Sequence, residues 1–406
     1  MKLEHPSGAR ASVARSGAER SRFGLLAGGM LALLLAMGVG RFAYTALLPQ
    51  MHEQGWLTVH EGALLAAANY LGYLLGAVWA ALSRRADPSR RLWIGLAASV
   101  STTWLMGAMG RLDLGLAVWC AVRGVAGVAS AFVYVYSTGI VLRRLAELGA
   151  ASWSGVHYLG VGAGIALSAL VAQFMLGHGS AAQAWYGLGG VAALAALVSA
   201  RQLVPAGRRA LSMHESVAID RGAAAARPLT WLALAYGLAG FGYIVNMTFL
   251  PLMLRGGEGA DSAMGGWLLV GLAAMPATVL WMRLAVRWGS YPALIACTLL
   301  QAVGVALPVL VAGVPAAMAG AVLLGGTFMG IAGLAQGLAR VPDPERSARR
   351  IGLITALYGG GQIAGPALVA VLGRGEDFRI AVLAAAAALL ASAALFEVSR
   401  RVERLG

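Results

Sequence analysis

The stretch Gly38-Val39-Gly40-Arg41-Phe42-Ala43-Tyr44-Thr45 places an arginine inside the first long apolar run of the chain, Leu25 to Pro49. A helix needs about 20 apolar residues to cross a bilayer, and this run is long enough. An arginine at the centre of such a span costs roughly 2.5–3.5 kcal/mol on insertion scales, so it usually faces a protein interior or a watery cavity. Arg41 is therefore predicted to form one wall of a substrate path.

The composition is that of a polytopic membrane protein, because 59% of the 406 residues are hydrophobic and only 12% are charged. In a bilayer the backbone must satisfy its own hydrogen bonds, which leaves helices or a closed barrel. The apolar runs do not alternate as barrel strands do. The predicted fold class is an all-α membrane protein.

Twelve transmembrane helices are predicted in two six-helix halves. A polar, basic cytoplasmic linker over 201–228 separates an N-terminal bundle (24–200) from a C-terminal bundle (229–399), with tails at 1–23 and 400–406. The expected spans lie near 24–49, 61–82, 92–110, 114–142, 151–176, 184–200, 229–254, 263–282, 290–312, 315–339, 351–372 and 380–399.

The net charge of +14 reflects membrane topology and does not indicate nucleic-acid binding. With the N-terminus inside, the inside tails and loops carry 25 of the 31 basic residues and the outside loops carry 4. Basic residues concentrate in cytoplasmic loops, so both termini are predicted to be cytoplasmic. The remaining two, Arg41 and Arg123, fall inside spans.

Two short patterns recur in both halves. Gly38-x-Gly40 followed by Leu48-Pro49 returns 202 residues later as Gly240-x-Gly242 and Leu250-Pro251. The run from His157 to Gly164 has a counterpart from Tyr358 to Gly365, at nearly the same offset. Two matches in one register indicate two pseudo-symmetric halves with a site between them, which is a transporter architecture.

These features resemble the major facilitator superfamily, and three motifs resemble its YbfB/YjiJ-type branch. The motifs are the run from Gly38 to Pro49, the run Ala68-Asn69-Tyr70-Leu71-Gly72-Tyr73-Leu74-Leu75-Gly76, and Gly155-Val156-His157-Tyr158. The resemblance implies a twelve-helix secondary transporter of a bacterial cytoplasmic (inner) membrane that works by alternating access, commonly as a monomer. It also implies that spans one, four, seven and ten line the cavity, with help from two, five, eight and eleven.

Two superfamily motifs are matched only in part. Arg123-Gly124-x-x-Gly127-x-x-x-Ala131 fits the fourth-helix motif without its usual Gln-Gly pair. At the end of the second span, Ala80 stands where the family's aspartate belongs, so the gating role of that motif is not carried over to this chain.

Polar side chains inside the spans are the candidate substrate ligands. Helical spacing places several of them on common faces, such as Arg41 with Tyr44 and Asn69 with Tyr73. The set predicted to bind substrate is Arg41, Tyr44, Asn69, Tyr73, Arg123, Tyr134, Tyr243, Asn246, Tyr358 and Gln362. For each of these the alternative is ordinary packing with the polar group satisfied by a neighbouring helix.

Arg41 and Arg123 determine the predicted cargo, since all 17 carboxylates lie in loops, tails or span ends. A buried unpaired charge is unfavourable, and an incoming anion would relieve it. Arginine grips a carboxylate through two parallel hydrogen bonds. The expected cargo is a small organic anion, a carboxylate, while the alternative is an exporter of amphipathic drugs or metabolites.

Energy coupling has one candidate in the spans, His157, which titrates near neutral pH. Exchange or facilitated diffusion needs no such group and fits equally well. No Ser/His/Asp set, metal-ligand spacing or phosphate-binding loop occurs, so neither an enzyme nor a cofactor or metal site is expected.

Overall fold

The computed structural model describes residues 22–83, 87–110, 112, 114–175, 179–212, 229–341, 343–372 and 377–405. Over these ranges every regular element is a helix, and twelve helices are long and apolar enough to cross a membrane. The predicted all-α fold with twelve spans is confirmed. Most of the predicted N-terminal tail and of the linker lies outside the described residues.

The first span, Arg22–Glu53, contains a π-helical stretch, η1 (Leu34–Phe42), followed by α2 (Ala43–Glu53). The other helices before the linker are α3 (Val59–Leu82), α4 (Pro88–Met109), α5 (Leu116–Glu147), α6 (Ser154–Met175, after the short turn η2, Ala151–Trp153) and α7 (Ala181–Ser212). Those after it are α8 (Thr230–Glu258), α9 (Ala260–Trp288), α10 (Ser290–Leu310), α11 (Val314–Ala339), α12 (Pro344–Leu372) and α13 (Arg379–Leu405).

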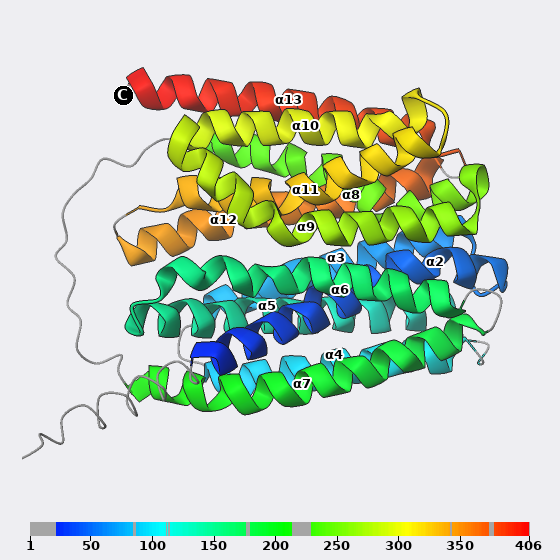
Figure 1. Ribbon diagram of the computed structural model, residues 1–406, viewed down its shortest axis with the longest axis horizontal. Helices are drawn as coiled ribbons and strands as arrows, with labels where there is room; N and C mark the ends of the chain where they lie inside the picture. Colours follow the sequence, from blue (N-terminus) through cyan, green and yellow to red (C-terminus); the bar gives the residue numbers. More distant parts are fainter. Residues whose placement is uncertain are drawn as a thin grey trace, which may run out of the picture.

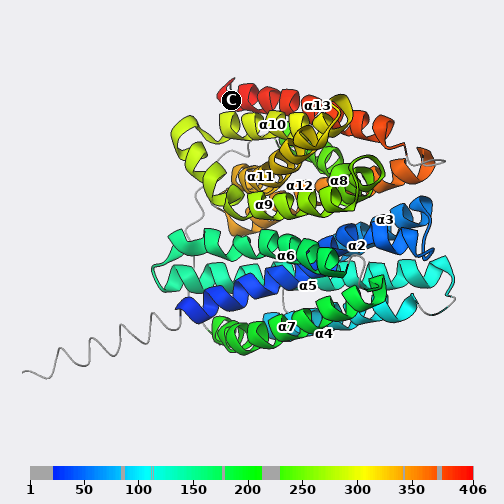
Figure 2. The same cartoon turned by 45° about the vertical axis from the view of Figure 1, so that its right-hand side comes forward.

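The helices form two layers (Figures 1 and 2). Those before the linker lie in one layer and those after it in the other, with α6 packed on α9 and α3 packed on α12 where the layers meet. The domain boundaries remain a prediction. Helix α7 continues to Ser212, into the segment expected to be linker, because Leu203 is fully buried there and Gln202 packs on Gly28 of the first span.

Local sequence signals determine where several helices begin. The Thr58 hydroxyl accepts from the Glu61 backbone N–H while the Glu61 carboxylate accepts from Thr58, a capping box that starts α3. The Asp87 carboxylate accepts from the Ser89 backbone, and Pro88 occupies the first turn of α4.

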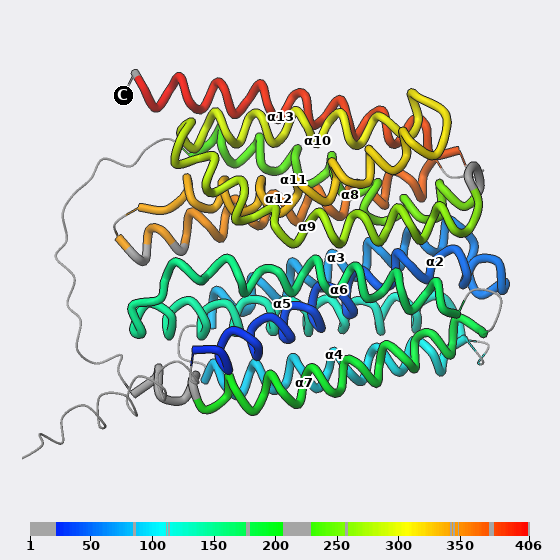
Figure 3. The backbone as a smooth tube through the Cα atoms, viewed as in Figure 1, coloured from blue at the N-terminus to red at the C-terminus, as the bar shows by residue number. Residues whose placement is uncertain are grey.

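Glycines allow the first span to pack directly on α6. A Cβ at Gly164 would lie 2.5 Å from the Cα of Gly38, and one at Gly160 would lie 2.1 Å from the Met30 carbonyl oxygen. Small residues let membrane helices approach this closely. In Figure 3 the first span, in blue, runs obliquely across its own layer. The contact at Gly38 lies within one helical turn of Arg41 and holds that part of the span in place.

Polar contacts join the two layers at several points along the helices. They are Thr45 to the Met247 carbonyl (2.8 Å), Tyr70 to Thr248 (2.8 Å), His60 to the Ala370 carbonyl (2.9 Å), Gln173 to Asp261 (2.8 Å), and the ion pair Glu53–Arg255.

Substitution of Gly164 with alanine is expected to destabilise the protein by about 1–3 kcal/mol, because the added methyl group meets backbone that cannot move aside. The matched control is Gly139→Ala in α5, where a Cβ has nothing within 4 Å. That change is expected to be neutral or stabilising by up to about 1 kcal/mol. Melting temperatures of the purified variants test this, and equal melting temperatures would contradict the packing argument.

Candidate functional site

A cavity of about 260 Å³ lies between the two halves. Its described lining comes from the first span and from α3, α5, α8, α11 and α12, which are spans one, two, four, seven, ten and eleven. Spans five and eight were expected to help line it, and they are not among its described walls. Helices α6 and α9 pack on each other instead, with a Cβ at Gly162 only 2.5 Å from the Gly271 carbonyl oxygen.

Arg41 lies at the wall of this cavity and is 3% exposed. Its guanidinium carbon lies 4.7 Å from the ring centroid of Tyr70 and 4.6 Å from that of Tyr73. Cation–π contacts of this kind contribute about 2 kcal/mol when desolvated, which offsets part of the cost of burial. Nη2 of Arg41 donates to Oε1 of Gln362 over 2.6 Å, and the Arg41 Nε has no hydrogen-bond partner.

Gln362 connects Arg41 to the opposite half of the protein. Its Oε1 accepts from Arg41, and its Nε2 donates to the hydroxyl of Tyr243 on α8. The guanidinium thus holds a neutral amide oxygen in the position where an anionic oxygen would bind more strongly. No carboxylate of the described residues forms an ion pair with Arg41.

Arg123 is 2% exposed but is not among the residues that line the cavity. Its guanidinium carbon lies 4.4 Å from the Tyr44 ring centroid, and Nη1 donates to the Gly40 carbonyl over 3.4 Å. The Asn69 side-chain amide donates to the Arg123 backbone carbonyl over 3.0 Å. Arg123 thus supports the backbone next to Arg41, while Asn69 bonds the backbone of Arg123 itself. Direct contact of Arg123, Tyr44 and Asn69 with substrate remains a prediction.

The position of Tyr44 differs from the expected shared face with Arg41. That expectation uses α-helical spacing, whereas residues 34–42 are π-helical, with the Ala43 N–H donating to the Gly38 carbonyl. The wider turn changes which residues lie above one another. Arg41 reaches the cavity, while the Tyr44 hydroxyl donates to the Gly62 carbonyl over 2.8 Å.

Of the ten predicted ligands, six line the cavity: Arg41, Tyr73, Tyr134, Tyr243, Tyr358 and Gln362. Asn246 lies elsewhere, with its amide donating to the Val305 carbonyl over 3.0 Å. His157 is fully buried, and its Nε2 pairs with the Thr138 hydroxyl at 3.0 Å. Thr138 lines the cavity, so His157 lies one hydrogen bond away from it.

Several lining residues were not selected from the sequence. Thr138, Gln336 and Thr355 are polar residues within spans, so the signal that found Gln362 was available for them too. Phe42, Phe328 and Met329 carry no polar group, and nothing in a single sequence separates them from ordinary core residues.

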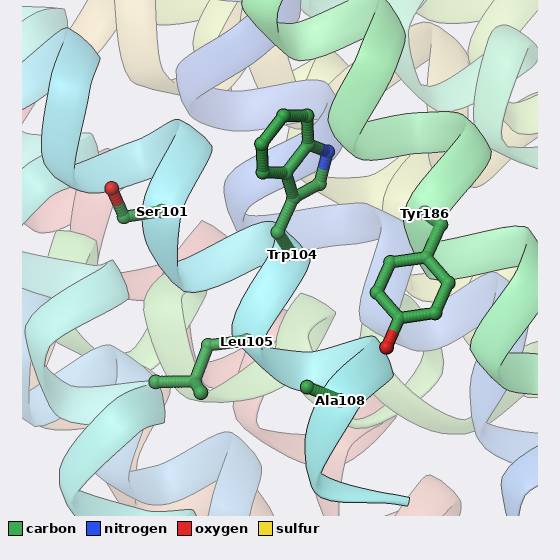
Figure 4. Close-up of a pocket in the computed structure, with 5 residues that line it drawn as sticks. All are labelled: Ser101, Trp104, Leu105, Ala108 and Tyr186. Carbon is green, nitrogen blue, oxygen red and sulfur yellow. The ribbon is translucent and has the colours of Figure 1, made fainter.

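A second hollow lies on the outer face of the first half, between α4 and α7 (Figure 4). Its volume is about 650 Å³, and its lining is Ser101, Trp104, Leu105, Ala108 and Tyr186. Trp104 is 48% exposed there, as expected for a side chain that faces lipid, and no charged residue is among the described lining. The central cavity is therefore the candidate substrate site.

Comparison with known families matches residues 33–397 to the family described as "Uncharacterised MFS-type transporter YbfB". No curated protein matches the chain. The match covers nearly the whole chain, including every helix that lines the central cavity. It agrees with the twelve spans, and the chain therefore belongs to the YbfB family of major facilitator superfamily transporters and is not an enzyme.

Proposed function

We propose that this transporter moves a small organic carboxylate across the bacterial cytoplasmic membrane. The supporting observation is Arg41, the only charged residue among the described residues that line the cavity. A buried cation in the wall of a low-dielectric cavity attracts an anion and repels a cationic cargo. The volume of about 260 Å³ is below the range of about 300–1,000 Å³ typical of drug-sized ligands, which disfavours an exporter of bulky amphipathic drugs.

The carboxylate is proposed to replace Gln362 as the partner of Arg41. In the structure Arg41 donates to the neutral Oε1 of Gln362, while its Nε has no hydrogen-bond partner. A carboxylate offers two charged acceptor oxygens in the geometry of the guanidinium fork. Gln362 belongs to the opposite half, so cargo binding exchanges a contact between the halves for a contact with cargo.

Transport is proposed to occur by alternating access, and the position of the cavity along the helices supports this. Ala77, Thr138, Gln336 and Ile351 line it, and each lies within three turns of the end of its helix nearest the predicted cytoplasmic face. Near the opposite end, the ion pair Glu53–Arg255 joins the halves. With both termini proposed to be cytoplasmic, this arrangement supports an inward-facing state. The protein is proposed to work as a monomer, as the family resemblance implies.

Proton coupling, if it operates, is proposed to use His157. Its Nε2 pairs with Thr138, which lines the cavity, so protonation at His157 is positioned to affect cargo through one hydroxyl. Exchange without a proton remains the competing mode, and a His157→Gln variant with an unchanged pH dependence of transport would favour exchange.

Substitution of Arg41 with glutamine is expected to weaken carboxylate binding by at least about 30-fold, since losing one partner of a buried charge pair costs about 2 kcal/mol or more. Arg41→Lys keeps the positive charge but loses the two parallel donors of the guanidinium. Its affinity for the carboxylate is expected to lie between those of wild type and Arg41→Gln. Calorimetric titration of the purified protein with benzoate and acetate measures this. Wild-type affinity in Arg41→Gln would overturn the proposal.

Gln362 supplies the matched pair of variants for the same titration. Gln362→Glu places a tethered carboxylate against Arg41 and is expected to abolish binding of added anions. Gln362→Met removes the competing acceptor at similar size and is expected to bind anions as well as or better than wild type. If both variants lose binding equally, Gln362 contributes shape and does not occupy the carboxylate position.

Reversing the charge of Arg255 is expected to open the end of the protein that holds the Glu53–Arg255 pair. Exposed pairs contribute up to about 1 kcal/mol, so Arg255→Glu should raise maleimide labelling of a Thr45→Cys reporter two- to fivefold. The test uses purified protein with Cys120 and Cys297 replaced by serine. The exchanged pair, Glu53→Arg with Arg255→Glu, should restore the original rate, and identical rates in all three proteins would contradict this role.

A further inference from the structure

Four aromatic rings form a continuous stack along the wall that the second half contributes to the cavity. The ring centroids of Tyr236 and Tyr358 lie 4.2 Å apart, those of Tyr358 and Tyr243 5.5 Å apart, and those of Tyr243 and Phe328 5.9 Å apart. The planes differ by only 15°, 14° and 4° in the same order. We call these four side chains the ring column, and all four line the cavity.

The ring column gives the cavity a wall of nearly parallel aromatic rings. Its inner members, Tyr358 and Tyr243, each stack against two neighbours in the column and also line the cavity. Aromatic rings pair with another π system in offset-stacked or edge-to-face arrangements, and such pairs contribute about 0.5–1.5 kcal/mol beyond the area that they bury. The column therefore suits a flat aromatic or unsaturated group placed against it.

Arg41 is connected to the ring column through one side chain. Arg41 donates a hydrogen bond to Gln362, which in turn donates to the Tyr243 hydroxyl, so a single amide group lies between the cation and the rings of the second half. A carboxylate that replaces the Gln362 oxygen carries the rest of its molecule to the column. On the facing wall Tyr73 and Tyr134 form an edge-to-face pair, with ring centroids 6.5 Å apart.

The charge count of the cavity limits the cargo to one carboxylate. Arg41 is the only charged side chain among its described lining residues. A second carboxylate would be desolvated without a cationic partner among the described lining residues, and a buried unpaired charge is strongly unfavourable. The volume of about 260 Å³ leaves room for a small molecule of one ring or its equivalent.

Resting on the proposed carboxylate transport, we propose that the cargo class is small planar monocarboxylates in which the carboxylate is conjugated to an aromatic or unsaturated group. The carboxylate binds Arg41, and the conjugated group packs against the rings of the ring column. Saturated and uncharged analogues each lack one of these contacts, and a doubly charged analogue adds a carboxylate that has no cationic partner among the described lining residues.

The experiment compares four probes of similar size by calorimetric titration of the purified, full-length protein. Benzoate has the charge and the flat ring, cyclohexanecarboxylate has the charge alone, terephthalate has a second charge, and benzamide has the ring alone. Benzoate is expected to bind two- to tenfold more tightly than cyclohexanecarboxylate, the range that aromatic pairing provides. Terephthalate and benzamide are expected to bind at least about tenfold more weakly than benzoate.

Two variants test whether the ring column causes the preference for benzoate over cyclohexanecarboxylate. Tyr358→Leu removes one of the column's two inner rings and is expected to equalise the affinities for benzoate and cyclohexanecarboxylate, while binding still requires a negative charge on the ligand. Trp104→Leu on the lipid-facing hollow is the control and is expected to keep the wild-type preference.

The outcomes separate this inference from the function on which it rests. If both monocarboxylates bind equally in wild type and binding depends on Arg41, carboxylate transport stands and the preference for planar cargo is wrong. A preference that survives in Tyr358→Leu also overturns the role of the column. If no monocarboxylate binds, or if binding is independent of Arg41, the proposed function itself fails.

Discussion

A buried guanidinium with no carboxylate partner among the described residues is the constraint on which the organisation of this protein depends. Arg41 is stabilised by two tyrosine rings and by one amide oxygen from the opposite half. Cation–π contacts and one charge-assisted hydrogen bond contribute a few kcal/mol together, enough to hold the cation in place in a span. They leave its Nε unpaired, so the guanidinium retains binding capacity for an anion.

The surrounding structure positions this one group. Glycines let the first span pack closely on α6 beside Gly38. Arg41 lies in the π-helical turn of that span and lines the cavity. The ring of Tyr44 makes a cation–π contact with Arg123. Arg123 and Asn69 add bonds to backbone carbonyls close to the site. The second half contributes the ring column and Gln362, so each half provides a different chemical part of the site: the cation from one half, and the flat wall with a displaceable acceptor from the other.

Much of the fold was predictable because hydropathy reports membrane spans directly, and the twelve expected spans correspond to the twelve helices. The polar residues Arg41, Tyr243 and Gln362 were also identifiable, since a polar side chain in a span must face protein. Polarity alone does not distinguish a residue that lines a cavity from one that bonds a neighbouring helix. Asn246 was therefore predicted to bind substrate, although its side-chain amide donates to the Val305 carbonyl. Phe328 and the π-helical turn have no signature in a single sequence, because both depend on packing between distant segments.

The most direct test of this account is a crystal structure of the protein soaked with 4-bromobenzoate, with the bromine located by its anomalous scattering. The account predicts one bromine site beside Tyr358, the carboxylate on the guanidinium of Arg41, and the Gln362 side chain turned away from its present acceptor position. Bromine on the lipid-facing hollow at Trp104, or an occupied cavity in which Gln362 still bonds Arg41 and the carboxylate lies elsewhere, would contradict it.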